Sequence, residues 1–491
     1  MPESRRETAP EFVDVLIVGA GISGIGAAYH LQKHCPKRSY RIFEARETLG
    51  GTWDLFRYPG IRSDSDMYTL GYSFRPWTNP KAIADGPSIL SYLRDTATEN
   101  GIDRRITYRR RVKSASWSSD RGTWIVVAEN TETGEEARVE CRFVMICAGY
   151  YDYDAGYTPD FPGVSSFRGR VVHPQHWPEG LDYDGKRVVV IGSGATAVTL
   201  VPELSKRAAH VTMLQRSPTY VISRPSEDPA ANWLRERLPE KVAYGITRWK
   251  NVLLGMAFFQ AAKRRPEFIR KMILGGVRKE LGPEYDVRTH FSPRYAPWDQ
   301  RVCLVPDHDL FAAIRDGRAE VVTDQIRTFT EHGLLLESGT ELPADIIVTA
   351  TGLELKVLGG VSLEVDGARV ELPKTTTYKG MMFSDVPNLT VCLGYTNASW
   401  TLKVDLTCEY ACRLMNHMDR KGYRKCTPRL TDPTLSEEPW ADLSSGYIQR
   451  KLHLFPKQGS KRPWRLHQNY ALDLLNLEYS SLTDGAMEFS R

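Results

Sequence analysis

The sequence predicts an α/β protein that contains two parallel-sheet domains, with a helical insert in the second domain. Two glycine-rich loops, 19–24 and 192–197, each follow a run of apolar, β-branched residues and precede a helical pattern. Between them lies the segment 167–178, with the pattern F-x-G-x-x-x-H-x-x-x-W-P. At 491 residues the chain is also too long for a single hydrophobic core. Together these observations predict two domains joined near 167–178.

Composition excludes several classes of protein. The net charge of +5, from 65 basic and 60 acidic residues, is too small to indicate nucleic-acid binding. Residues 1–10 are polar, so we expect no secretory signal, and no uncharged run reaches the ~18 residues of a membrane span. The eight cysteines form no C-x-x-C pair and no zinc-binding pattern. We therefore expect a cytoplasmic protein with reduced thiols and without a metal site.

The first glycine loop has the context of a Rossmann-like dinucleotide site. It follows the strand predicted at 14–18 and opens a helix, and a second strand ends at Glu44. Gly19 would make the tight turn, Gly21 would admit a pyrophosphate, and Gly24 would let the helix pack on the strand. Glu44 is placed to accept hydrogen bonds from ribose hydroxyls. The alternative is a glycine-rich helix start that binds no ligand.

The second glycine loop differs from the first in the residue that follows its second strand. That strand, 210–214, is followed by Arg216, where the first unit has Glu44. An arginine can bind a 2′-phosphate bidentately, whereas a carboxylate repels it. The second site should therefore prefer NADPH, and by elimination the first should hold FAD. The candidate NADPH contacts are Gly192, Gly194, Thr196, Arg216 and Ser217.

The segment 50–64 alternates aromatic and charged residues between two turn signals, Gly-Gly and Pro-Gly. Such a loop is more typical of a site lining than of a core. We expect Trp53 and Tyr58 to contact a cofactor and Asp64 to act in the site. The alternatives are packing under a loop for the two aromatic residues and a solvated carboxylate for Asp64.

The segment 225–300 interrupts the second domain with three predicted helices, at 233–238, 242–262 and 268–281. Lysines and arginines, among them Arg248, interleave with apolar residues along these helices. The simplest interpretation is a helical cap with a solvated basic face. An oligomer contact and a peripheral membrane surface are the functional alternatives.

The remaining elements complete the two domains. Strands are predicted at 142–149, 345–352 and 387–394, and a helix of about four turns should end near Gly422. Its N-terminus could face the flavin through Asn397, although Asn397 and Ser399 are equally typical helix caps. We predict an FAD-binding domain from 1–152 and 385–491, and an NADPH-binding domain at 153–384 that includes the insert 225–300.

With these motifs assembled, the chain resembles the class B flavoprotein monooxygenases, and among them the type I Baeyer–Villiger monooxygenases. The signature of that family is complete as Phe167, Gly169, His173, Trp177 and Pro178. A second family pattern, [AG]-G-x-W-x-x-x-x-[YF]-P-G-x-x-x-D, is complete from 50 to 64. The two glycine loops flank the signature in the family order, so the resemblance covers nearly the whole chain.

The resemblance implies FAD, NADPH and a C4a-peroxyflavin, with an arginine that stabilises the peroxide and an aspartate that positions this arginine. These two roles map onto Arg301 and Asp64. His173 and Trp177 are the working residues of the joint, and His173 would help to set how the lobes and NADP⁺ move rather than act as a general base. Many relatives carry Lys-Arg where this chain has Gln300-Arg301, so Arg216 and Ser217 would carry more of the 2′-phosphate recognition.

The leading hypothesis is an NADPH- and O₂-dependent enzyme that converts ketones to esters or lactones and also oxygenates sulfides and thioamides. Its rival oxygenates mainly sulfur or nitrogen. A disulfide reductase lacks its dithiol here, because no C-x-x-C is present. A non-catalytic flavoprotein that uses the basic insert as a contact surface is the remaining alternative. The expected partners are O₂ and a small ketone or sulfur compound, and oligomerisation is left open.

Overall fold

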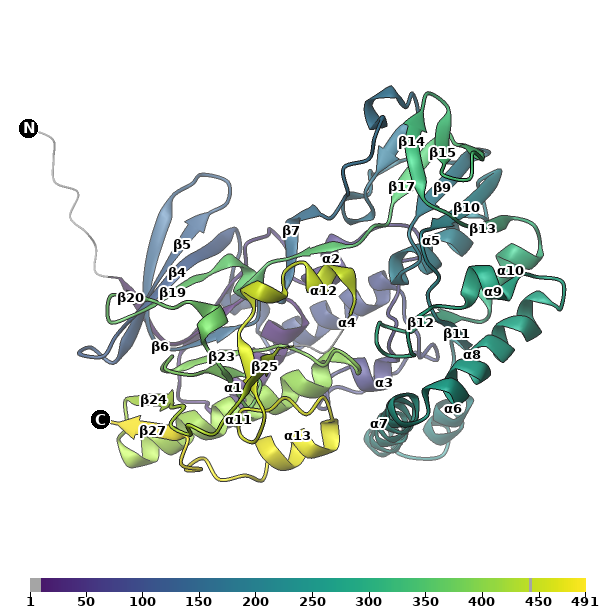
Figure 1. The fold of residues 1–491 in the computed structure, drawn as a ribbon. Coiled ribbons are helices and arrows are strands. Elements are labelled where there is room, and N and C mark those ends of the chain that lie inside the picture. Colours follow the sequence, from purple (N-terminus) through teal and green to yellow (C-terminus); the bar gives the residue numbers. More distant parts are fainter. Residues whose placement is uncertain (1–9, 441–443) are drawn as a thin grey trace, which may run out of the picture.

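The computed structural model describes residues 10–440 and 444–491, and it has the expected two-lobed α/β architecture (Figure 1). The first lobe is built on a nine-stranded sheet. Eight strands follow in the spatial order β20 (Ala368–Arg369), β19 (Ser362–Val365), β4 (Arg110–Ser118), β5 (Thr123–Asn130), β6 (Glu136–Ile146), β1 (Glu11–Val18), β2 (Tyr40–Phe43) and β3 (Ile106–Thr107). The ninth strand, β23 (Leu389–Val391), pairs with the last residues of β6.

The ligand-facing part of this sheet is parallel. Strand β1 pairs in parallel with β2 and with β6, and β23 also pairs in parallel with β6. Helices α1 (Ile22–His34), α4 (Gly86–Glu99) and α11 (Trp400–Lys421) cover one face through a shared apolar cluster. The carboxyl ends of β1, β2 and β6 therefore meet at one edge, where parallel sheets place their ligands.

The second lobe has a five-stranded, all-parallel sheet. Its order is β13 (Ala319–Thr323), β10 (His210–Gln215), β9 (Arg187–Ile191), β17 (Ile346–Thr349) and β8 (Arg170–Val172). Helices α5 (Ala195–Leu204) and α10 (Asp309–Arg315) contribute apolar residues to the cluster that packs on this sheet. The smaller pairings are β11 (Val221–Arg224) with β12 (Cys303–Pro306), and β14 (Ile326–Thr330), β15 (Gly333–Leu336) and β16 (Glu341–Pro343) in one antiparallel sheet.

Two connecting strands join the lobes. Strand β7 (Tyr151–Gly156) leads into the second lobe, β18 (Leu353–Leu355) leads back, and the two pair antiparallel. The chain then rejoins the first sheet at β19, which pairs with β4. The chain therefore returns to the first sheet before residue 385, the domain boundary expected from the sequence. The short strands at 362–369 carry no motif that would assign them to either lobe, so the sequence did not indicate this earlier return.

The insert is helical as expected: α6 (Pro229–Arg235), α7 (Glu240–Arg264), α8 (Pro266–Leu281) and α9 (Val287–Phe291). Not all of its basic residues are solvated, however. Arg248 is buried and donates hydrogen bonds to the backbone oxygens of Tyr68 (2.9 Å) and Gly71 (2.8 Å) in the first lobe, next to α3 (Met67–Leu70). Among the described residues, no helix is long and apolar enough to cross a membrane.

The C-terminal region packs on the first lobe (Figure 1). Helix α11 has 22 residues, about six turns rather than four, and ends at Gly422, whose φ of 66° terminates it. The remaining elements are α2 (Thr52–Leu55), α12 (Gly446–Gln449), α13 (Tyr470–Leu477), β21 (Thr377–Tyr378), β22 (Met382–Phe383), β24 (Lys425–Pro428), β25 (Glu437–Pro439), β26 (Lys457–Gly459) and β27 (Met487–Ser490). Short 3₁₀ turns lie at Asp103–Arg105, Val164–Ser166, Pro174–His176, Val357–Gly360, Leu372–Lys374 and Leu452–Leu454.

Candidate functional site

A cavity of about 360 Å³ lies at the carboxyl ends of the first lobe's parallel strands. Seven of the residues predicted from the sequence line it: Gly19, Gly21, Glu44, Trp53, Asp64, Arg301 and Asn397. Arg301 belongs to the segment that follows the helical insert, whereas the other six belong to the first lobe. The cavity is therefore closed by residues that only the folded chain brings together.

The glycines of the first loop are required by backbone packing. A Cβ on Gly19, whose φ is +101°, would lie 2.7 Å from the oxygen of Cys147. A Cβ on Gly24 would lie 1.9 Å from the oxygen of Gly19, so only glycine lets α1 approach the turn. Gly21 caps α1 and lines the cavity, and it provides no side chain to bond the first backbone N–H groups. Those N–H groups at the positive end of the helix suit an anion such as a pyrophosphate.

Glu44 connects the glycine loop to the second strand. It is only 6% exposed and accepts hydrogen bonds from the backbone N–H of Ala20 (2.7 Å) and of Arg46 (3.0 Å). Burial raises the pKa of the Glu44 carboxyl, and these two backbone donors work against that rise. The carboxylate thus holds the loop in place and also borders the cavity, where remaining oxygen lone pairs can accept from a ribose.

Arg301 and Asp64 form an ion pair at the wall of the cavity. The Arg301 Nη1 lies 3.2 Å from the Asp64 Oδ2. Burial disfavours the guanidinium charge, but Asp64 and the tyrosines 150, 447 and 151 outweigh it and raise the pKa of Arg301 above its ordinary value. Arg301 is therefore a permanent cation that faces the cavity in a fixed orientation.

Further aromatic side chains that the motifs did not identify as site residues also line this cavity. They include Tyr150, Tyr151, Tyr153, Trp298, Tyr395 and Trp400. Burial raises the pKa of Tyr151 to about 12, so it stays a neutral hydroxyl. The signal for the first three was available, because they lie in the crossover that follows the carboxyl end of β6. Trp298 and Trp400 come from distant segments without such a signal.

Three buried polar atoms in this wall have no hydrogen-bond partner among the described residues. They are the Arg301 Nε, the Trp298 Nε1 and the Asn397 Oδ1. Buried donors and acceptors are normally paired, so these atoms fit a polar ligand in the cavity. Asn397 does not cap α11: its Nδ2 donates to the oxygen of Gln468, and the N-cap residue Ser399 makes no side-chain cap bond.

A second cavity, of about 370 Å³, adjoins the first. The two share Asp64, Ser65, Trp298, Val302, Asn397 and Ala398 as lining residues. Helix α7 supplies much of the remaining wall, including Met256, Phe258 and Phe259. An apolar compartment thus opens beside the Arg301–Asp64 pair, and it suits an apolar small molecule.

The second glycine loop is assembled with its arginine, but it borders neither of these two cavities. The Gly192 N–H donates to the oxygen of Leu214, and the Ser193 Oγ donates to the oxygen of Ser217 (3.2 Å), so the loop lies beside the end of β10. Arg216 and Ser217 are exposed there. A Cβ on Gly194 would meet nothing within 4 Å, so packing does not require glycine and the space above it is open.

The loop 50–64 bridges the lobes and divides its aromatic residues between two environments. Trp53 lines the first cavity, as expected. Tyr58 instead packs in the apolar cluster of the second lobe and lines neither cavity, which favours the packing alternative for this residue. Its hydroxyl bonds Thr196, and burial raises the pKa of Tyr58 to about 12. Thr196 is therefore engaged by the bridging loop.

The segment 167–178 lies at the joint and not at the cavity. The ring of His173 accepts at Nδ1 from the Gln175 N–H, so its Nε2 donates to the oxygen of Gly352 (3.2 Å), directly before β18. A Cβ on Gly156, the last residue of β7, would lie 2.0 Å from this ring. Trp177 packs against the second lobe's core. His173 therefore packs against both connecting strands. Neither His173 nor Trp177 lines either of the two cavities.

Comparison with known proteins gives a consistent result. Residues 72–240 match the family model "Flavin-binding monooxygenase-like", and residues 17–81 match an "NAD(P)-binding Rossmann-like domain". The chain is 53% identical to the FAD-containing monooxygenase EthA of Mycobacterium tuberculosis over 482 residues, which are 98% of each chain. Among solved structures it is similar to an oxidized steroid monooxygenase bound to NADP, with a TM-score of 0.75, 22% identity, and coverage of 98% of this chain and 100% of that one. The OTEMO complex with FAD and NADP matches with a TM-score of 0.75, 20% identity and the same coverage.

Proposed function

This chain belongs to the FAD-containing flavin monooxygenases, and from that premise we propose that it is an NADPH- and O₂-dependent Baeyer–Villiger monooxygenase. It would insert one oxygen atom next to a ketone carbonyl to give an ester or lactone, and oxygenate sulfides and thioamides as a second activity. The observation that carries this proposal is the Arg301–Asp64 ion pair, in which Arg301 lines the first cavity and Asp64 lines both cavities.

The residues of the first cavity fit FAD. The uncapped start of α1 at Gly21 suits the pyrophosphate, and Glu44 suits a ribose. The unpaired atoms of Trp298, Arg301 and Asn397 supply polar groups for the flavin end. The second glycine loop, with the exposed Arg216 and Ser217 beside it, fits NADPH and a 2′-phosphate. When bound, the flavin supplies the oxygen chemistry, and the chain supplies binding and positioning.

Arg301 would stabilise negative charge on the oxygen that is transferred. Its raised pKa means that it holds an anion without donating a proton to it. An oxygen atom that remains anionic is a nucleophile, and a nucleophile attacks a carbonyl carbon. A protonated one is an electrophile and reacts with sulfur. The permanent cation therefore favours ketone oxidation over sulfur oxygenation.

Asp64 would act on Arg301 rather than on the substrate. Its Oδ2 accepts from the Arg301 Nη1 and leaves the guanidinium Nε, which is buried and unpaired among the described residues, free for a ligand. The substrate would occupy the apolar second cavity, whose wall of α7 residues excludes water next to the reacting atoms. Positioning and water exclusion are thus contributions of this chain itself.

The test uses the holoenzyme with NADPH under air and one substrate that carries both a ketone and a thioether. Nuclear magnetic resonance of the products distinguishes oxygen inserted beside the carbonyl from oxygen added to sulfur. The proposal expects ester or lactone as the main product, with some sulfoxide. Sulfoxide alone would support the rival heteroatom oxygenase, and ketone-independent NADPH oxidation with neither product would contradict both.

A further inference from the structure

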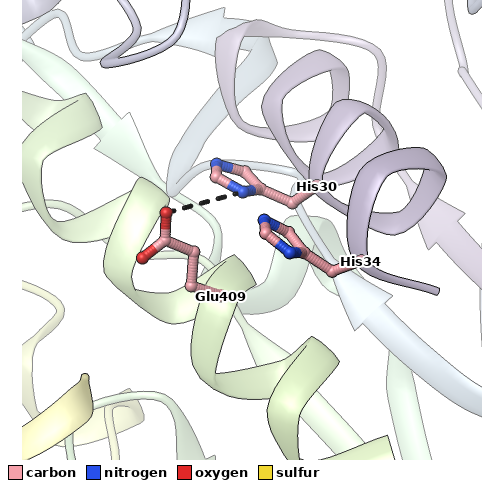
Figure 2. Close-up of side chains that lie close together, drawn as sticks. All are labelled: His30, His34 and Glu409. Carbon is pink, nitrogen blue, oxygen red and sulfur yellow. Dashed lines mark ion pairs between the residues drawn. The ribbon is translucent and has the colours of Figure 1, made fainter. Parts of the chain in front are cut away.

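Two histidines and a glutamate lie together between helices α1 and α11 of the first lobe. His30 and His34 are one turn apart on α1, and Glu409 projects toward them from α11 (Figure 2). One potential ligand atom from each of the three lies within 4.8 Å of the other two. None of these residues lines either cavity, so the cluster is separate from the cofactor site.

His30 is the central residue of this cluster and it is only 1% exposed. Its Nε2 lies 3.2 Å from the Asp405 Oδ1, which fixes a hydrogen on that nitrogen if Asp405 is ionised. Its Nδ1 is buried and has no hydrogen-bond partner among the described residues. A buried imidazole with one nitrogen held by a carboxylate and the other unpaired has the arrangement of a metal-binding histidine.

The nearest acceptor to this unpaired nitrogen is too far away for a hydrogen bond. The His30 Nδ1 and the Glu409 Oε1 are 3.8 Å apart, beyond hydrogen-bond range (Figure 2). The distance of 3.8 Å is closer to the separation of two ligands of one ion than to the length of a hydrogen bond. Bonds of about 2.0–2.1 Å to a tetrahedral zinc place nitrogen and oxygen ligands roughly 3.4 Å apart. The ring of His34 stacks 5.8 Å from that of His30, and solvent can reach it, so it is able to rotate toward the same point.

We propose that His30, His34 and Glu409 bind a divalent transition-metal ion of the zinc class. Two imidazoles and a carboxylate are a ligand set that zinc prefers, and Asp405 would orient His30 from behind. A fourth position would be filled by water, because His34 lies at the accessible end of α1.

The ion would link helices α1 and α11 directly and helix α7 indirectly, through Asp405. Helices α1 and α11 run side by side in the same direction, since the Trp400 Nε1 donates to the Ser23 Oγ at their beginnings and the Asn416 Nδ2 to the oxygen of His34 near their ends. Asp405 also lies 3.6 Å from the Arg248 Nη2 of α7. A metal at His30 would therefore reinforce the contact of the two helices whose N-termini face the first cavity, and through Asp405 the docking of the helical insert.

The experiment measures zinc binding by the tag-free holoenzyme after chelator treatment, with calorimetric titration of ZnCl₂ and elemental analysis. We expect one zinc per chain and a rise in the thermal midpoint. His34→Ala and Glu409→Gln should weaken binding by at least the ~10–100-fold that loss of an outer-shell partner costs, and zinc should no longer raise their thermal midpoints. His332→Ala, which changes an exposed histidine of the second lobe, should bind zinc as the unaltered protein does.

Flavin content and unfolding without zinc show whether each variant is folded. His34 is accessible and its ring makes no hydrogen bond in the described part of the chain, so His34→Ala should retain the fold. The eight cysteines are all buried, and Cys35→Ser should leave zinc affinity unchanged because the Cys35 Sγ bonds the oxygen of Cys412 instead. Absence of zinc uptake by the unaltered protein, or undiminished affinity in both His34→Ala and Glu409→Gln, would overturn the proposal.

Discussion

The Arg301 guanidinium and the Asp64 carboxylate lie 3.2 Å apart although 237 positions separate them in the chain. Asp64 ends the loop that the first lobe extends toward the second. Arg301 lies two residues before β12, a strand that packs in the second lobe's core. The pair can therefore form only when the two lobes are docked. If Arg301 acts as proposed, it is therefore in place for oxygen transfer only when the two lobes are docked.

Removal of the guanidinium should abolish most oxygen transfer. We expect Arg301→Ala to lower the rate of ester formation by about 10²–10³-fold, the range typical of losing one preorganised stabilising group. Flavin content and the rate of flavin reduction by NADPH should change little, because the other contacts of the first cavity remain. Product formation and stopped-flow absorbance measure these two effects separately.

Arg294→Ala is the matched control for that variant, since Arg294 is an exposed arginine of the same segment. It should leave ester formation unchanged. Full ester formation by Arg301→Ala would remove the proposed role, whereas loss of bound flavin would show that Arg301 serves mainly in binding.

Glu44 should determine how tightly the flavin is held. In Glu44→Gln, an amide NH₂ group replaces one of the two carboxylate oxygens. This donor would then face one of the two backbone N–H groups that now donate to the carboxylate. An unsatisfied buried donor costs about 1–3 kcal/mol, so FAD affinity should fall roughly 5- to 150-fold. Equilibrium dialysis of FAD measures it. Glu135→Gln, at an exposed turn of the same lobe, should bind FAD normally, and equal affinity of both variants would refute the assignment of Glu44.

Arg216 should discriminate between the two nicotinamide cofactors. We expect Arg216→Ala to raise the KM for NADPH by about 10- to 100-fold, the loss of a charge-assisted hydrogen bond of about 1.5–3 kcal/mol. The KM for NADH should stay the same, because NADH lacks the 2′-phosphate. Steady-state kinetics with both cofactors test this. Arg327→Ala, an exposed arginine of β14, serves as control, and an unchanged preference in Arg216→Ala would place phosphate recognition elsewhere.

His173 should make the stability of the lobe joint depend on pH. Burial lowers the pKa of His173 below its ordinary value, so the folded joint favours the neutral ring. The unfolded chain takes up this proton below about pH 6.5, so the stabilisation is fully present above that pH and is lost as the pH falls through the lower folded pKa. The thermal midpoint of the unaltered protein should therefore fall more steeply from pH 7.5 to about pH 5 than that of His173→Gln.

The matched change His176→Gln, at an exposed neighbouring histidine, should keep most of the steep pH dependence, because burial is the main cause of the lowered pKa of His173 and the charge of His176 a smaller one. If His173→Gln and the unaltered protein lost stability in parallel, the ring would have no part in holding the joint. Uncoupled peroxide release by His173→Gln, with normal flavin reduction, would extend its role to lobe movement during turnover.

The sequence predicted those parts of the molecule that depend on local chemistry. Both glycine loops, the acid and the arginine that follow their second strands, and the helices of the insert all rest on short-range patterns of turn, strand and helix. The structure has both glycine loops as expected and a helical insert, although α6 covers Pro229–Arg235 rather than 233–238 and α9 was not predicted. The extent of α11 was underestimated, because its interior contains buried polar residues such as Lys403 and Asp405 that interrupt the apolar pattern.

Contacts between distant segments lay beyond local patterns. The ring of Tyr58 packs in the other lobe, Arg248 is buried against the backbone of the first lobe, and Trp298 and Trp400 both line the first cavity. Each depends on how the lobes dock, which no periodicity in the chain encodes. The assignment of Arg301 and Asp64 came from family resemblance, and the geometry adds that they are in contact.

Because β7 pairs with β18, the chain passes into the second lobe and returns from it at the same place. The strands that complete the first sheet, β19, β20 and β23, lie after the whole of the second lobe in the chain. As the chain emerges from the ribosome, we therefore expect the second lobe to finish folding while the first still lacks part of its sheet. The order of folding is thus the reverse of what the N-terminal position of the first glycine loop suggests, and the flavin site would be the last part of the protein to mature.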